Sequence, residues 1–262
     1  MTEDKAASNK LYDHPKYYEI AFSFRDIPAE VDLFEQCFKR YSNIPVRSVL
    51  ELGCGSTPHL EELLGRGYRY HGLDLSQAML DYSREKASRL GGEVDLFQAD
   101  MVNFSLETPV DFAFIMLGTL SVKSTAQLVS HFDCVARSLH KGGLYLLDWC
   151  VQFDPPWATE GGTSWEMERD GIKVKTHVRW ELISRVEQTF REIITLEVDD
   201  HGKTISLVDK DVKRALFPQE FLCFISSSEH FEFVGWWNNW DLSQPLEKAD
   251  KADRPIVLVR RR

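Results

Sequence analysis

Two glycines and a later acid are the residues in this chain best placed to do chemistry. Gly53 and Gly55 follow the apolar run Val49–Leu52 and precede a helical pattern that starts near Pro58. A glycine turn between a strand and a helix brings the backbone close to a ligand and directs free N–H groups at it. The next apolar run ends on Asp74, which is placed to accept hydrogen bonds from ribose hydroxyls. The pattern predicts a nucleoside-binding strand–helix–strand unit.

The sequence around the turn narrows the kind of nucleoside. A dinucleotide fingerprint requires a third glycine, whereas Gly53–Gly55 is followed by Ser56, Thr57 and Pro58. Glu51 adds a carboxylate just before the turn, which disfavours a pyrophosphate and suits a ligand with an amino group and a sulfonium. An NAD-binding oxidoreductase is therefore a weak alternative, although a nucleotide-binding fold does not itself fix the chemistry.

Five segments, in order, resemble one family. The string Glu51–Gly55 resembles the first motif of the Rossmann-like S-adenosylmethionine (SAM) methyltransferases, and Gly72–Leu80 resembles the second. Val94–Met101 resembles the third strand and its adenine-binding end, and Val110–Leu120 the fourth strand with the loop under the methyl donor. Lys141–Asp148 resembles the glycine turn into the fifth strand. The resemblance therefore covers about Val46 to Asp148.

The resemblance implies SAM as the cofactor and assigns residues to its site. Asp74 would bind the ribose, and Asp100 would accept from the adenine amino group, unless it only caps the turn before Asn103. The strand ends should also form the acceptor pocket, because open α/β sheets bind ligands there. The implied SAM-binding residues are Tyr18, Phe22, Arg25, Glu51, Gly53, Cys54, Gly55, Asp74, Leu75, Met79, Asp100, Met101, Met116 and Leu117. The implied pocket residues are Gly118, Thr119 and Trp149.

The organisation of the chain predicts an α/β fold: a Rossmann-like seven-stranded methyltransferase sheet with an N-terminal helical lid and an inserted antiparallel β-sheet. Helical patterns broken near Pro28 place the lid at residues 1–44, with residues 1–10 polar. The SAM-binding core takes 45–150 and 216–262. Alternating stretches, with a hairpin signal at Asp199–Gly202, place the insert at 151–215, over the acceptor pocket.

This layout is similar to that of small-molecule methyltransferases that act on amines, such as glycine, sarcosine and sugar N-methyltransferases. The lid of the sugar enzymes has two aromatics and then an arginine, with the spacing of Tyr18, Phe22 and Arg25. The resemblance implies that Arg25 pairs with the methionyl carboxylate and that the aromatics cover the sulfonium. Two alternatives stay open: the aromatics are core residues, or Arg25 forms a surface ion pair with Asp26.

The donor chemistry constrains the mechanism. A sulfonium methyl is already activated, so its transfer needs alignment more than covalent help. An amine must be neutral to attack, which requires a desolvating pocket or a base, and His177 is the candidate base, with packing or a surface role as its alternative. We see no convincing metal cluster and expect no metal. The expected reaction is methyl transfer to a small-molecule amine; the alternatives are a small-molecule O-methyltransferase or a non-catalytic SAM-binding scaffold.

Composition excludes some partners. The 262 residues carry a net charge of −10 and are 43% hydrophobic, so a nucleic-acid substrate is disfavoured, because phosphate backbones require a basic surface. Without a signal peptide or a long apolar run, we expect no membrane partner and a cytoplasmic location. Five cysteines without C-x-x-C spacing indicate neither zinc nor disulfides. The tryptophans at 236–240 favour a core edge or an oligomer interface over a substrate cage, and edge strands of the insert would allow a homodimer.

Overall fold

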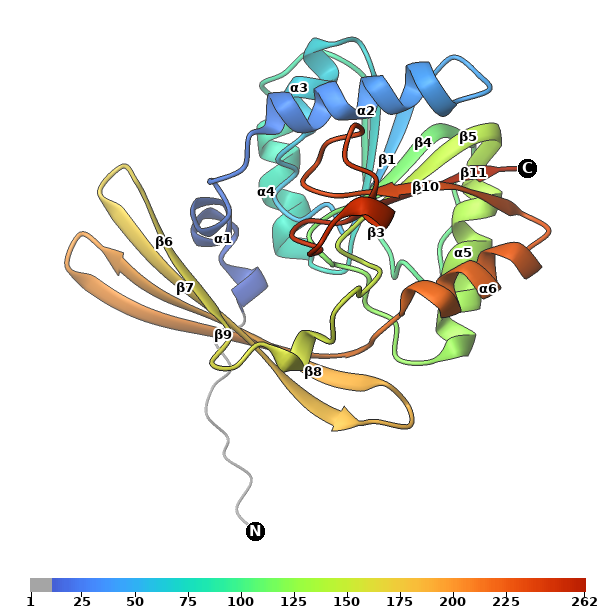
Figure 1. Cartoon of the computed structure of the whole chain (residues 1–262). Helices are drawn as coiled ribbons and strands as arrows, with labels where there is room; N and C mark the ends of the chain where they lie inside the picture. The colour runs from blue at the N-terminus through green and yellow to red at the C-terminus, as the bar shows by residue number, and fades with distance from the viewer. Residues whose placement is uncertain (1–10) are drawn as a thin grey trace.

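A seven-stranded sheet forms the centre of the molecule in the computed structural model, which describes residues 11–262 (Figure 1). Its order is β10-β11-β5-β4-β1-β2-β3, and only β11 runs antiparallel to its neighbours. The strand order reverses between β1 and β4, so a ligand crevice is expected at their carboxyl ends. The strands are β1 (Ser48–Leu52), β2 (Arg69–Asp74), β3 (Val94–Gln98), β4 (Val110–Ile115), β5 (Leu139–Asp148), β10 (Phe231–Trp237) and β11 (Ile256–Arg261).

Helices cover both faces of this sheet, because its central strands are apolar on both sides. Phe112 and Phe114 of β4 pack on the face covered by α2 (Ile27–Tyr41), α3 (Leu60–Gly65) and α4 (Gln77–Ala87). Ala113 and Ile115 pack on the other face, under α5 (Thr125–Ser138) and α6 (Pro218–Ser227). The predicted architecture, a seven-stranded sheet with an extra antiparallel sheet, is confirmed.

Two helix boundaries differ slightly from the sequence pattern. The helix expected from Pro58 begins only at Leu60, because Thr57 has a φ of 49° and the intervening residues form a turn. Pro28 lies inside the first turn of α2, where the missing N–H costs no helical hydrogen bond. The predicted N-cap of α4 is confirmed, since Ser76 Oγ accepts from Met79 N at 3.2 Å.

The segment after β5 forms a second, four-stranded antiparallel sheet that stands beside the core (Figure 1). The predicted hairpin is confirmed, with His201 and Gly202 at φ values of 52° and 89° in the turn, the backbone of a type I′ connection. The strands are β6 (Thr163–Arg169), β7 (Ile172–Ser184), β8 (Thr189–Asp200) and β9 (Lys203–Arg214), preceded by the 3₁₀ turn η2 (Pro156–Ala158).

The N-terminal elements lie between the two sheets. The turn η1 (Leu11–Asp13) and helix α1 (Pro15–Ala21) pack on the buried face of the insert, and α1 also contacts α4 (Figure 1). Trp165 Nε1 donates to the Ala21 carbonyl at 2.6 Å, and Tyr17 donates to Asp200 at 2.8 Å. The lid is thereby joined to the insert. The first ten residues of the predicted lid lie outside the described residues.

The two ends of the tryptophan cluster have different environments. Trp236 and Trp237 are buried at the end of β10, as expected for a core edge. Trp240 lies in the following loop, before the 3₁₀ turn η3 (Leu246–Lys248), and its ring covers Arg254 at 4.3 Å. Between residues 11 and 262, no helix combines the length and the apolar character that crossing a bilayer requires.

Candidate functional site: a nucleoside crevice with a buried charge network

The glycine turn after β1 has the backbone geometry that its sequence predicts. Gly53 and Gly55 have φ values of 65° and 51°, which favour glycine. A Cβ atom on Gly53 would stand 2.6 Å from Thr119 Cγ2, so the turn and the loop after β4 are in close contact. Cys54 is buried with its sulfur against Gly72 of β2, and burial raises the pKa of its thiol well above the usual range. The turn is therefore a backbone cradle without a reactive thiolate.

Asp74 closes this cradle from the end of β2. Its Oδ2 accepts from Gly55 N at 2.8 Å, and its Oδ1 accepts from Ser76 N at 2.8 Å. Burial raises the pKa of Asp74, while these N–H groups partly oppose the shift. Each oxygen keeps a lone pair, because an ionised carboxylate accepts about four hydrogen bonds. Asp74 can therefore bind a diol while it holds the turn.

The residues expected around an adenine have mixed exposure. Leu75 is 62% exposed next to Asp74, which leaves an apolar surface for a flat ring. Met79 and Met101 are buried, and the Met101 methyl lies 3.5 Å from where a Gly53 Cβ would stand, so it supports the turn from below. Asp100 is exposed, and its Oδ1 accepts from Val102 N at 3.0 Å, so it caps a turn, while its other oxygen accepts no hydrogen bond from residues 11–262.

The carboxyl ends of β4 and β5 meet where the acceptor pocket is predicted. Met116 is buried at the end of β4, and Leu117 and Gly118 follow with positive φ values of 53° and 65°. Leu117 N donates to Asp148 Oδ2 at 3.0 Å, which holds the loop against β5. Trp149 has a φ of 58°, is 41% exposed and contacts Gly118. The structure thus brings together Gly118, Trp149 and, across the glycine turn, Thr119.

The lid places one aromatic residue over the cradle and one beside the insert. The Tyr18 ring lies 3.7 Å from the Cβ position of Gly55, and it packs on Phe22 with ring centroids 4.6 Å apart. Phe22 in turn contacts Trp165 of β6 edge-on at 5.5 Å. Tyr18 therefore borders the nucleoside crevice, whereas Phe22 joins the lid to the insert.

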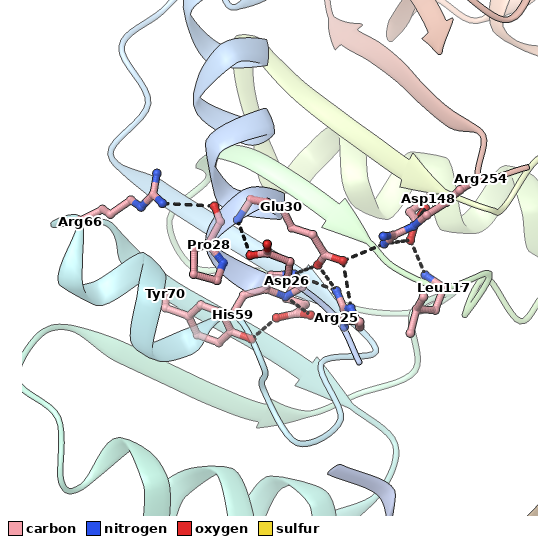
Figure 2. Close-up of polar contacts among 12 residues, drawn as sticks. Arg25, Asp26, Pro28, Glu30, His59, Arg66, Tyr70, Leu117, Asp148 and Arg254 are labelled. Atoms are coloured by element: carbon pink, nitrogen blue, oxygen red, sulfur yellow. Dashed lines mark hydrogen bonds and ion pairs between the residues drawn. The ribbon is translucent and has the colours of Figure 1, made fainter. Parts of the chain in front are cut away.

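Behind the glycine turn lies a network of buried charges that the sequence pattern did not predict (Figure 2). Glu30, at the start of α2, accepts from Arg25 Nε at 3.1 Å and from Arg254 Nη2 at 2.9 Å. His59 bridges two acids, with Nε2 at 2.9 Å from Glu30 and Nδ1 at 2.9 Å from Glu51. Arg254 continues the network to Asp148, at 3.0 Å from its Oδ2. Tyr70 completes the coordination of Glu51, donating to Oε2 at 2.5 Å.

The network is electrically balanced when His59 is protonated. Burial opposes its charge, but Glu51 and Glu30 outweigh burial and raise the pKa of His59. Burial likewise opposes the ionisation of Glu30, yet hydrogen bonds from His59 and Arg25 hold its pKa far below the usual range. Three cations (Arg25, His59 and Arg254) then face three anions (Glu30, Glu51 and Asp148), which is the condition under which buried charges are tolerated.

This network changes the partners of two residues that the sequence assigned to SAM. Arg25 is 5% exposed and binds Glu30, not the neighbouring Asp26, which caps α2. Glu51 is 3% exposed and both of its oxygens are engaged by His59 and Tyr70. In this structure both side chains therefore act within the protein, beside the crevice. Their predicted contacts with SAM stay predictions.

His177 does not join the site. It lies on β7 between Thr176 and Val178, which face the buried side of the insert, so its own side chain projects from the opposite side. Ser164 Oγ lies 2.7 Å from His177 Nδ1 on that outer face. The structure therefore places the predicted base away from the glycine turn, for the simple reason that successive strand residues face opposite ways.

Sequence reasoning missed several residues that border the crevice. Glu30, His59 and Arg254 come from three distant segments and carry no local motif. Glu192 on β8 and Lys213 on β9 also face inward. The sequence could have indicated them only weakly, because alternation along a strand predicts which positions share a face but not which face is buried.

The described residues fit SAM. The two glycines hold the turn at positive φ, Asp74 has lone pairs left for a ribose, and the exposed Leu75 offers an apolar surface to adenine. Tyr18 lies above the turn, where a sulfonium would gain from an aromatic face. When bound, SAM supplies a methyl group on a sulfonium, whose C–S electron pair stays with sulfur when a nucleophile takes the methyl carbon.

Comparisons with known proteins agree with this geometry. Residues 49–143 match the sequence profile of a family described as a methyltransferase domain. No curated protein sequence matches the chain significantly.

Solved structures share the fold over nearly the whole chain. An S-adenosylmethionine-dependent methyltransferase from Clostridium acetobutylicum has a TM-score of 0.75 at 17% identity, covering 93% of this chain and 95% of its own. DesVI from Streptomyces venezuelae has a TM-score of 0.72 at 18% identity, covering 94% and 97%. The sugar N-methyltransferase KedS8 from a Streptoalloteichus species has a TM-score of 0.70 at 21% identity, covering 100% and 97%. Residues 49–143 therefore match a methyltransferase domain, and the chain as a whole has the Rossmann-like fold of these solved methyltransferases.

Proposed function

We propose that the protein transfers the methyl group of SAM to an amine nitrogen of a small molecule. The observation that carries this proposal is the joint between lid and insert: α1 and η1 pack on the inner face of β6–β9, and this unit stands over the carboxyl ends of β4 and β5. Such an enclosure suits a small acceptor and leaves little room for a folded polymer. The similarity to KedS8, a sugar N-methyltransferase, extends over the same elements and supports an amine acceptor.

The division of labour follows from the same arrangement. We assign residues 1–44 to the lid, 45–150 and 216–262 to the SAM-binding core, and 151–215 to the insert that selects the acceptor. Asp74, Leu75 and the glycine turn would hold the nucleoside, with Tyr18 over the sulfonium. Gly118, Thr119 and Trp149 would line the acceptor side.

The test is a two-stage binding and turnover experiment. The purified protein is titrated with SAM, S-adenosylhomocysteine and NAD by calorimetry, and we expect micromolar binding of the first two alone. It is then incubated with SAM and paired acceptors that differ only in an amine or a hydroxyl: glucosamine and glucose, glycine and glycolate, phenethylamine and 2-phenylethanol. Methylation of amines over their hydroxyl partners is expected. A preference for the hydroxyl series would contradict the proposal, and so would binding of NAD in place of SAM.

A further inference from the structure

The inner face of the insert carries a row of charged side chains at the end nearest the core. On β8 and β9, Glu192 pairs with Asp211 and Ile194 pairs with Asp209 in the strand register. Ile194 belongs to the buried face that packs against the lid, and paired residues share a face. Glu192, Asp209 and Asp211 therefore face the lid and the core, together with Lys213.

Three of these four residues already have partners, and they fix β9 to the core. Lys213 is buried, forms an ion pair with Glu192 and donates to the Gly118 carbonyl at 3.3 Å. Glu192 also accepts from Trp180 Nε1 at 3.0 Å. Asp211 accepts from Ser121 Oγ at 2.5 Å. The row is thereby held against the loop after β4, where the acceptor pocket is proposed.

Asp209 is the member of the row whose carboxylate is left available. Among residues 11–262 no side chain donates a hydrogen bond to it, so apart from the backbone N–H of Lys210 its oxygens are unpaired, although it is only partly exposed. It faces Tyr12 of η1, whose pKa is raised by burial first and then by Tyr18, Asp209, Glu192 and Asp74. Tyr12 therefore lies near the charged row of the insert and also near Asp74 of the donor crevice.

A second observation concerns two tyrosines of the lid. The hydroxyl groups of Tyr12 and Tyr18 form no hydrogen bond with any group of residues 11–262, and both residues are only partly buried. Their hydroxyls are therefore open to a ligand. Tyr12 is anchored at the donor side, since its carbonyl accepts from Ser76 Oγ at 3.1 Å, and Tyr18 covers Gly55. A polar ligand between the donor crevice and Asp209 would supply the missing partners.

We propose that Asp209 binds the ammonium form of the acceptor amine and takes one proton from it. This inference rests on the proposed N-methyltransferase function and names the residue that selects its substrate. The carboxylate of Asp209 accepts a proton from R–NH₃⁺, which frees the nitrogen lone pair. That lone pair forms the new N–C bond as the C–S bond breaks toward sulfur, so the thioether leaves neutral and the product is R–NH₂⁺–CH₃. Asp209 then returns its proton to water.

The electrostatics of the row suit this role. Burial raises the pKa of Asp209, Asp211 and Glu192 raise it further, and Lys213 opposes them. A carboxylate with a raised pKa is a stronger base than an exposed one and holds its charge beside a cation. Tyr12 is the facing titratable group of the lid, and it stays protonated near neutral pH.

The test compares Asp209→Asn with a matched control on the other side of the same sheet. Glu197→Gln removes the same charge from an exposed position on the outer face of β8. Each variant is assayed with the best amine of the paired panel for KM, kcat and their pH dependence, and by calorimetry for binding of that amine in the presence of S-adenosylhomocysteine. Asp209→Glu tests rescue by a second carboxylate.

We expect Asp209→Asn to raise KM and weaken amine binding roughly tenfold to hundredfold, since hydrogen bonds to charged groups are worth about 1.5–3 kcal/mol. The affinity for S-adenosylhomocysteine should stay within about twofold, the acid limb of the pH profile should disappear, and Glu197→Gln should match the wild type. If Asp209→Asn methylates the amine as well as the wild type does, this inference is overturned but the proposed function is not. A wild-type enzyme that methylates only the hydroxyl series overturns the proposed function and this inference with it.

Discussion

Replacing Glu30 with glutamine tests whether the buried network is held together by charge. In the wild-type protein Glu30 contacts Arg25, Arg254 and His59 while only 3% of its side chain is exposed. Glutamine keeps the shape and one acceptor oxygen, but it turns an amide N–H₂ toward cationic donors and leaves one excess positive charge. Breaking a buried ion pair in this way costs about 3–5 kcal/mol. Because glutamine retains one acceptor, we expect the lower end, about 3 kcal/mol.

The assay is urea unfolding at several pH values, with the melting temperature as a second readout. A loss of about 3 kcal/mol corresponds to a drop in Tm of about 10 °C for a protein of this size. The folded pKa of His59 is raised above 6.5, so its contribution is fully present below pH 6.5 and is lost as pH rises through the folded pKa. The penalty of Glu30→Gln should therefore be larger at pH 6 than at pH 9.

The matched control is Glu35→Gln on the same helix, where the carboxylate pairs with Arg66 and is 41% exposed. Exposed pairs contribute about 0–1 kcal/mol, so this variant should unfold almost like the wild type. If Glu30→Gln lost no more stability than Glu35→Gln, or lost the same amount at pH 6 and pH 9, the network would not be the balanced buried cluster described above.

Three further predictions concern the nucleoside crevice. Asp74→Asn should weaken S-adenosylhomocysteine binding by roughly tenfold to a hundredfold in calorimetry, because a charge-assisted bond to the ribose is lost; unchanged affinity would place the ribose elsewhere. Leu75→Ala should weaken the same binding several-fold with unfolding free energy within about 0.5 kcal/mol, since the side chain is 62% exposed; a large loss of stability would show a packing role instead. Gly53→Ala should abolish binding and lower Tm, because its Cβ would stand 2.6 Å from Thr119 Cγ2 at a φ of 65°. Adding Thr119→Ser removes that methyl and should recover part of the Tm but not all, and full recovery would mean that the backbone conformation is not strained.

Local patterns in the sequence determined the order of elements and the nucleoside cradle. Gly53, Gly55 and Asp74 belong to one strand–turn–helix–strand unit, so their geometry follows from residues that are near one another in the chain. The same holds for the N-cap Ser76 and for the hairpin turn at Asp199–Gly202, where glycine permits the required positive φ. Short-range chemistry was sufficient for these features.

Only the tertiary structure decided which distant side chains meet. Glu30 and Arg254 lie at opposite ends of the chain, and their contact depends on how α2 packs against the loop before β11. The sequence also did not determine which face of the insert strands is buried, because alternation with a period of two fixes only which residues share a face. Packing of the insert on the lid decides which face is buried, so that His177 faces outward and Asp209 faces the lid.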